Sequence, residues 1–167
     1  MPDRELTPTS YIVLGLLDKA PGTPYDLKAL VAAGLGNFWT IPHAQLYSET
    51  ARLAEEGLLH EERESEGRRR KVYSITKTGK KALTAWLKVP VDDLGEMRDP
   101  GLLKVFFGAE PAMIASGQAA AHKAKLKEWE ALKGNLRNLE VPEGVLLALE
   151  AGIIHQRTFA KFWASLL

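Results

Sequence analysis

The stretch TIPHAQLYSETARLAEEGLLHEERESEGRRRKVYSIT, residues 40–76, decides the fold. In its first half, apolar and small residues recur every three or four positions, which predicts a helix with one buried face. This inward stripe consists of Leu46, Thr50, Leu53 and Ala54. We expect Thr40 to cap the helix and Gly57 to end it. Two short extended runs follow, LLHEERES and GRRRKVYSI, joined by a turn around residues 66–67. The stretch therefore predicts a helix followed by a β-hairpin.

Helices are predicted on both sides of this stretch. Thr7 and Thr23 each precede a proline and open a helical pattern, and Pro21 stops the first of the two. Thr76 is the predicted cap of a helix that follows the hairpin. Three helices, two strands and a further helix within residues 1–89 are the order of a winged helix-turn-helix. In that architecture the third helix enters the DNA major groove and the hairpin wing lies on the backbone.

The composition changes at residues 90–101, where prolines, glycines and acidic residues predict a linker. Beyond it, residues 102–167 read as a short apolar helix, a long helix from 111 to about 138 and a final helix from 143 to 167. The expected fold class is therefore mainly α with a two-stranded β-wing. It combines an N-terminal winged helix-turn-helix with a C-terminal α-helical dimerisation domain.

The final helix carries two apolar stripes, which is typical of a helix buried on more than one side. We expect one side to pack on its own subunit and the other on a second copy, which makes a homodimer. The alternative is a helix that is central in the bundle of a monomer. The residues assigned to the dimer contact are Leu102, Leu103, Phe106, Leu149, Ile153, Phe159, Phe162 and Trp163. The apolar residues of 102–107, Phe107 included, are expected to be buried at this junction.

The overall composition is that of a globular protein, with 46% hydrophobic and 26% charged residues and a net charge of +1. A surface that binds a polyanion must therefore be local. The chain has no cysteine, which excludes disulfides, thiolate nucleophiles and cysteine-ligated metal sites. It also lacks an apolar signal segment, a membrane-length apolar run and the common catalytic motifs. We expect a cytoplasmic protein that is not an enzyme and that uses no cofactor or metal.

The outward face of the helix before Gly57 suits contact with DNA bases. Base edges offer donors, acceptors and the thymine methyl group, which small or hydrogen-bonding side chains match. Gln45 can pair bidentately with adenine, Ser48 can contact a base or a phosphate, and Tyr47 can reach a phosphate. The predicted DNA-binding residues of this helix are Ala44, Gln45, Tyr47, Ser48 and Arg52. His43 is expected to face inward, as a packed or capping histidine.

Charge is segregated along the predicted hairpin. Residues 49–66 hold seven acidic and two basic residues, whereas residues 67–81 hold seven basic residues and no acidic one. The basic residues at and after the turn are predicted to contact phosphates beside a groove. They are Arg68, Arg69, Arg70 and Lys71. The alternative is ion pairing with the acidic strand, at Glu61, Glu62 and Glu64. Both can hold, because alternate side chains of a strand face opposite ways. A nuclear localisation signal is a third reading, which the interspersed strand residues disfavour.

Three segments, in order, resemble the PadR family of transcriptional regulators. They are LTPTSYIVLGLLDKAPGTPYDL (6–27), LYSETARLAEEGLL (46–59) and GRRRKVYSITKTGKKALTAWL (67–87). Their combination is specific, whereas other winged-helix regulators share each part alone. MRDPGLLKVFFG (97–108) is similar to the start of the C-terminal domain in one branch of the family. Pro24 stands where many members have glycine before the tyrosine of the second helix, so we expect a changed turn there.

The resemblance implies a homodimeric repressor that binds a palindromic operator in double-stranded DNA and is often released by a small phenolic compound or a drug. The family's recognition-helix tyrosine falls on Tyr47, and its basic wing residues fall on 68–71. One alternative is a winged-helix module for protein or RNA binding, which predicts no preference for a palindromic duplex. A MarR-like regulator is another, disfavoured because too little precedes Thr7 for an N-terminal dimerisation helix. Four tryptophans are expected to pack structurally rather than to line an effector cavity. They are Trp39, Trp86, Trp129 and Trp163.

Overall fold

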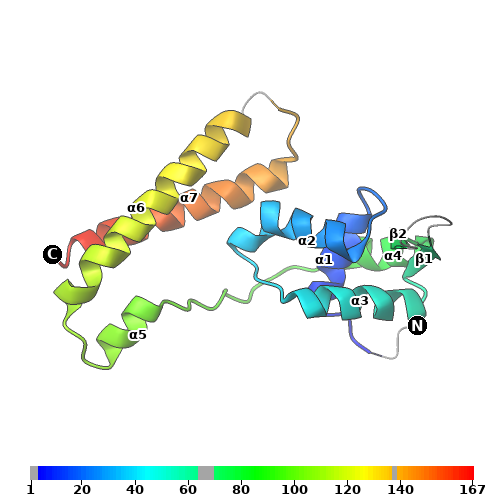
Figure 1. The fold of residues 1–167 in the computed structure, drawn as a ribbon, viewed down its shortest axis with the longest axis horizontal. Helices are drawn as coiled ribbons and strands as arrows, with labels where there is room; N and C mark the ends of the chain where they lie inside the picture. Colours follow the sequence, from blue (N-terminus) through cyan, green and yellow to red (C-terminus); the bar gives the residue numbers. More distant parts are fainter. Residues whose placement is uncertain (1–3, 64–69, 137–138) are drawn as a thin grey trace. The chain divides into compact units, whose positions relative to one another are not determined.

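The computed structural model of the chain describes residues 4–63, 70–136 and 139–167. The chain divides into two compact units, Met1–Asp92 and Asp93–Leu167, each described by itself below (Figure 1). The division falls inside the stretch 90–101, where the composition changes, and residues 87–98 are exposed along their whole length. None of the described helices is both long and apolar enough to cross a membrane.

The first unit has the element order that the sequence predicts, with a 3-10 turn added after the second helix. Its elements are α1 (Pro8–Leu17), α2 (Pro24–Ala33), η1 (Leu35–Asn37), α3 (His43–Glu55), β1 (Leu59–Arg63), β2 (Lys71–Ile75) and α4 (Lys77–Trp86). The two strands pair antiparallel, in a register that runs from Leu59 opposite Ile75 to Arg63 opposite Lys71. Gly22 forms an isolated antiparallel bridge with Tyr73. This bridge, which the sequence did not reveal, ties the turn between α1 and α2 to the wing.

The structure confirms two predicted helix caps, Thr23 and Thr76, and adds a third at Thr7, which was predicted only to open its helix. Thr7 and Thr23 each accept a hydrogen bond from the third helical amide, with a proline in the first helical turn, and Thr76 caps α4 through the amide of Gly79. The prediction that Thr40 caps the third helix is wrong, because Pro42 occupies the N-cap position of α3. The residue before a proline is held out of the helical region, so the helix begins only at His43.

One apolar core holds the first unit together. The predicted inward stripe of α3 enters it, with Leu46, Thr50 and Leu53 buried and Ala54 packed against it. Gly57 follows α3 with φ +72°, the left-handed conformation that favours glycine at a helix end. The other buried hydrophobic residues of this core are Val13, Leu14, Leu17, Leu27, Val31, Ile41, Leu58, Leu59, Tyr73 and Leu83. Since its inner face is fixed in this way, α3 presents its opposite face to solvent.

The second unit is built on a pair of long helices. Its elements are α5 (Pro100–Phe106), α6 (Pro111–Leu136) and α7 (Glu143–Ala164). Figure 1 shows α6 and α7 side by side and running in opposite directions. Trp129 lies directly on the backbone of α7, because Gly152 has no side chain and a Cβ there would overlap the indole ring. At the other end Trp163 packs on Gly101, with Ala115 and Ala119 in the same core.

Candidate nucleic-acid interface

The solvent face of α3 carries most of the residues that the sequence singled out. Ala44, Gln45, Tyr47 and Ser48 are all exposed, whereas Leu46, Thr50 and Leu53 on the opposite face are buried. Ser48 donates a hydrogen bond of 3.2 Å to the carbonyl of Gln45, and its oxygen can still accept one. The structure therefore brings a carboxamide, a hydroxyl, a phenol and a methyl group to one accessible surface.

His43 does not lie where the sequence analysis expected it. It is exposed rather than inward-facing. The reason is the late start of the helix: His43 is the first residue of α3, beyond the end of the buried stripe that begins at Leu46. Ile41, outside the helix, fills the neighbouring part of the core instead.

Arg52 is part of a polar network inside the protein. Its Nε donates to Glu49 Oε2 at 3.0 Å, its Nη2 donates to Glu49 Oε1, and its Nη1 donates to Glu56 Oε1 at 2.5 Å. The side chain is 20% exposed, so it does not extend into solvent as Gln45 does. A contact between Arg52 and DNA remains a prediction that this geometry does not favour.

Glu49 is a buried acidic residue of α3 that the sequence analysis missed. It is 9% exposed although it carries a carboxylate. Ser10 on α1 donates to Glu49 Oε1 at 2.5 Å. Burial alone would raise the pKa of Glu49, but hydrogen bonds from Arg52 and Ser10 and the charges of Arg52 and Arg4 outweigh it and hold this pKa below its usual value. The sequence did offer one signal for this arrangement: the acidic, basic and acidic residues at 49, 52 and 56 have the spacing of ion pairs along one helix.

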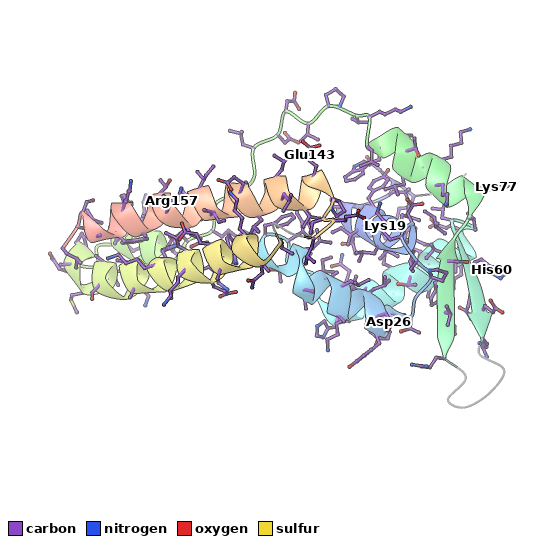
Figure 2. The ribbon with its side chains drawn as sticks, turned by 90° about the horizontal axis from the view of Figure 1, so that it is seen from above. Lys19, Asp26, His60, Lys77, Glu143 and Arg157 are labelled. Atoms are coloured by element: carbon purple, nitrogen blue, oxygen red, sulfur yellow. The ribbon has the colours of Figure 1, made fainter. Side chains whose placement is uncertain are left out.

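The wing shows one of the two interactions that the charge pattern allows, an ion pair between its strands. Arg68 and Arg69 lie outside the described residues, and Arg70 is exposed. Lys71 Nζ lies 2.9 Å from Glu61 Oε2, an ion pair between the paired strands. Figure 2 shows these two strands side by side, with His60 on β1 and Lys77 at the start of α4. The ion-pair alternative is therefore seen at Lys71, while the phosphate-contact alternative stays a prediction for residues 68–70.

Glu61 organises the polar side of the hairpin. Its Oε2 also accepts a 2.9 Å hydrogen bond from the Tyr73 hydroxyl. The hydrogen bond from Lys71, helped by that from Tyr73, lowers the pKa of Glu61 against the opposing effect of burial. Burial and the same hydrogen bond to Glu61 raise the pKa of Tyr73 to about 12. Tyr73 is therefore a neutral donor at physiological pH, and Glu61 a carboxylate.

The residues assigned to a dimer contact separate into three groups. Leu103, Phe106 and Phe162 are exposed in the single chain, with Phe106 83% exposed. Ile153 and Trp163 are buried within their own unit. They could therefore support a dimer contact only by holding the exposed residues in place, not by touching the partner. Leu102 and Phe159 pack partly against the core of the unit, and Leu149 is half-buried.

The burial expected of the apolar residues of 102–107 at a contact between two subunits stays a prediction, and in the single chain this segment is only partly buried. Only Leu102 and Val105 pack on the core of the second unit. Phe107 is exposed and makes an edge-on contact with Phe106, with ring centroids 5.3 Å apart. A helix that packs on one neighbour buries one face, and the face of α5 that carries Leu103 and Phe106 is exposed.

The four tryptophans lie in different surroundings. Trp129 and Trp163 are buried in the second unit. Trp86 stacks on Tyr11 with ring centroids 4.5 Å apart, and Trp39 is partly exposed.

Between α6 and α7 a hollow of about 330 Å³ is lined by two ion pairs, Arg157–Glu130 and Lys133–Glu150. Arg157 is seen on α7 in Figure 2. Throughout the described ranges, no group of three or more histidine or acidic side chains could hold a metal ion.

Comparison with known proteins gives a consistent assignment. The model of the transcriptional regulator PadR-like family matches residues 13–85. The negative transcriptional regulator PadR of Bacillus subtilis (strain 168) is 30% identical over 129 residues, which cover 72% of this chain and 70% of that protein.

Solved structures of the same Bacillus subtilis protein have a similar fold. Its complex with operator DNA has a TM-score of 0.82 at 26% identity and covers 93% of this chain and 95% of the other. Its complex with p-coumaric acid has a TM-score of 0.76 at 24% identity, with 96% of each chain covered. The similarity therefore includes both units.

Proposed function

Because the chain belongs to the PadR-like family of transcriptional regulators, we propose that it is a cytoplasmic repressor that binds a palindromic operator in duplex DNA as a homodimer. The observation that carries this proposal is the solvent face of α3, where Ala44, Gln45, Tyr47 and Ser48 are exposed together opposite a buried stripe. The operator complex of the Bacillus subtilis relative supports duplex DNA as the ligand.

The face of α3 supplies the contacts that sequence recognition needs. Gln45 can donate to adenine N7 and accept from its amino group, Ala44 can touch a thymine methyl, and Ser48 can bond a base or a phosphate. The exposed hydroxyl of Tyr47 can bond a phosphate. Pro42 has no side-chain oxygen with which to cap α3, so the first amides of the helix are suited to a phosphate oxygen.

The wing supplies the part of the affinity that does not depend on sequence. Arg68, Arg69 and Arg70 are the proposed phosphate contacts, since each neutralised phosphate releases counterions and steepens the dependence of affinity on salt. Lys71 is also a proposed phosphate contact, although Glu61 pairs its charge in the free protein.

The second unit is the proposed site of dimerisation. A single winged helix reads too few base pairs for high specificity, and two copies on a symmetric site solve this. The exposed apolar side chains of Leu103, Phe106 and Phe162 support a contact that covers them in a dimer. The two half-sites would then be centred about one helical turn, roughly 34 Å, apart.

A small apolar or phenolic effector is proposed to release the DNA. The Bacillus subtilis relative has been crystallised with p-coumaric acid, which suggests phenolic acids as the first compounds to test. Adding p-coumaric acid to the preformed complex should lower the duplex affinity. An affinity unchanged at millimolar p-coumaric acid would contradict this compound as the effector without affecting the proposed DNA binding.

The function is tested by gel shift against the DNA upstream of the gene that encodes the chain, over a salt series. We expect a complex whose affinity falls as salt rises. Gln45→Ala and Ser48→Ala should change which base pairs are preferred, while Glu55→Gln, an exposed change at the far end of α3, should not. Indifference of the duplex preference to Gln45 and Ser48 would instead favour a winged-helix module for protein or RNA binding.

A further inference from the structure

A buried polar network connects the proposed recognition helix α3 to the first turn of α1. It consists of Ser10 on α1 and Glu49, Arg52 and Glu56 on α3, and we call it the α1–α3 network. Ser10 is fully buried and Glu49 nearly so. Ser10 and Glu49 are 39 positions apart in the sequence, so their hydrogen bond joins two separate elements.

The Ser10 hydroxyl uses all of its hydrogen-bonding capacity within this network. It donates to Glu49 Oε1 at 2.5 Å and accepts from Arg52 Nη2 at 3.1 Å and from the Thr7 amide at 2.8 Å, and the Thr7 hydroxyl also lies 3.1 Å from it. A serine hydroxyl has one donor and two acceptor positions, so none is left over. Because Thr7 and Ser10 also form the capping box of α1, the network is anchored to the start of that helix.

The guanidinium of Arg52 fixes the other side of the network. It meets both oxygens of Glu49 through Nε and Nη2, a fork geometry that only arginine provides. Its Nη1 is bonded to Glu56. All the acidic partners lie on α3 itself, one turn before and after Arg52, so the charge of this arginine is balanced within the protein.

We propose that Ser10, Glu49 and Arg52 are positioning residues that set the rotation of α3 about its axis, and that Arg52 does so without contacting DNA. This inference rests on the proposed function, since it concerns how α3 is presented to a duplex. Apolar contacts through Leu46 and Leu53 hold α3 on the core but are not directional. The hydrogen bonds of Glu49 and Arg52 to Ser10 are directional, and a binding site needs its elements held within about 10–20°.

The consequence for recognition is specific. If α3 rotates, Gln45 and Ser48 lose their alignment with base edges, while the cations of the wing keep their access to phosphates. Loss of the network should therefore lower the preference for one sequence and leave the general affinity for duplex DNA in place. A residue that contacts phosphate would behave in the opposite way.

The test compares two duplexes in fluorescence anisotropy over a salt series. One duplex is selected by the wild-type protein from a random pool, and the other is its scrambled form of equal length and composition. Glu49→Gln and Ser10→Ala should each lower the ratio of the two affinities roughly tenfold, comparable to the discrimination carried by about one base pair. Arg52→Gln should lower the same ratio and leave the salt slope on the scrambled duplex unchanged.

Glu55→Gln is the matched control. It removes the same charge from the same helix, but Glu55 is exposed and lies outside the network, so the affinity ratio should stay at the wild-type value. Circular dichroism sets the temperature at which every variant is folded. Ser10→Ala removes only a hydroxyl and keeps all charges, so it tests the proposal even if Glu49→Gln does not fold.

Two results would overturn the positioning role. One is an unchanged affinity ratio in Ser10→Ala and in the folded Glu49 variant. The other is a salt slope that flattens by about one unit in Arg52→Gln, which would show that Arg52 neutralises a phosphate. A wild-type protein that selects no sequence would contradict the proposed function itself, so the two failures can be told apart.

Discussion

Gly79 lies where α4 passes close to the backbone of Leu58, the residue directly before β1. A Cβ at this position would overlap the carbonyl oxygen of Leu58 and would lie 2.9 Å from Ile75 Cγ1. Backbone cannot move aside as a flexible side chain can, so Gly79→Ala should destabilise the protein by about 1–3 kcal/mol. Urea unfolding followed by circular dichroism measures this change.

The control for Gly79 is a second helical glycine of the same unit. A Cβ at Gly15 in α1 would meet nothing within 4 Å. Gly15→Ala should therefore stabilise the protein by about 0.5–1 kcal/mol through its helix propensity. Equal effects of the two substitutions would contradict the close approach at Gly79.

Glu49 makes the stability of the fold depend on pH. Its pKa is lower in the folded chain than its usual value, because the hydrogen bonds from Arg52 and Ser10 and the charges of Arg52 and Arg4 outweigh the opposing effect of burial. The stabilisation from its charge is therefore complete above the unfolded pKa of about 4.3 and is lost as the pH falls below it. Between pH 7 and pH 3, the urea midpoint of Glu49→Gln should fall less than that of the wild type. An identical fall in both proteins would show that Glu49 does not contribute.

The helical pattern predicts single residues well where apolar burial decides their place. Leu46, Thr50 and Leu53 lie inward as their spacing indicates. The pattern fails at Glu49, because its partner Ser10 is distant in the sequence and a charged residue is expected outside. It fails at His43 because the start of α3 was predicted two residues too early. Pro42, not Thr40, precedes the helix.

At the scale of elements, the hairpin of β1 and β2 balances its own charge. Glu61 pairs with Lys71, so this cation is less available to a phosphate than its position suggests. Because alternate side chains of a strand face opposite ways, the sequence predicted that basic residues of one strand could pair with acidic residues of the other. The pairing partner of Lys71 could not be derived, because it depends on the register between the strands.

Removing the carboxylate should release this cation. Glu61→Gln is expected to raise the affinity for duplexes of any sequence and to steepen the salt slope by about one unit, the contribution of one further phosphate contact. Glu62→Gln removes an equal charge from the neighbouring, exposed residue on the opposite side of the strand and should leave the slope unchanged. Equal slopes in the two variants would assign the effect to net charge alone.

At the scale of the whole molecule, we assign DNA binding to the first unit and dimerisation to the second. The first unit carries the face of α3 and the wing, and the second carries exposed apolar side chains that a monomer would leave in water. The sequence predicted the helices of the second unit from their periodicity. It did not predict which of these residues are exposed to solvent, because a short helix such as α5 has apolar residues on nearly every side, so its sequence does not show which face is buried.

Sedimentation tests the role of the second unit. The wild-type protein should sediment with twice the 18.4 kDa mass of one chain. Leu103→Asp and Phe106→Asp place a charge in the proposed contact and should give monomers, since a buried unpaired charge is costly. Leu94→Asp, at a linker residue that is 96% exposed, should remain a dimer. Monomers at all concentrations of the wild type would contradict the proposed homodimer.

Selection of duplex DNA from a random pool by the wild-type protein, followed by sequencing, tests the central proposal most directly. A homodimer that reads bases through α3 should enrich an inverted repeat with half-sites centred about one helical turn, roughly 34 Å, apart. A pool without enrichment, or an enriched site without two-fold symmetry, would contradict operator recognition by a dimer.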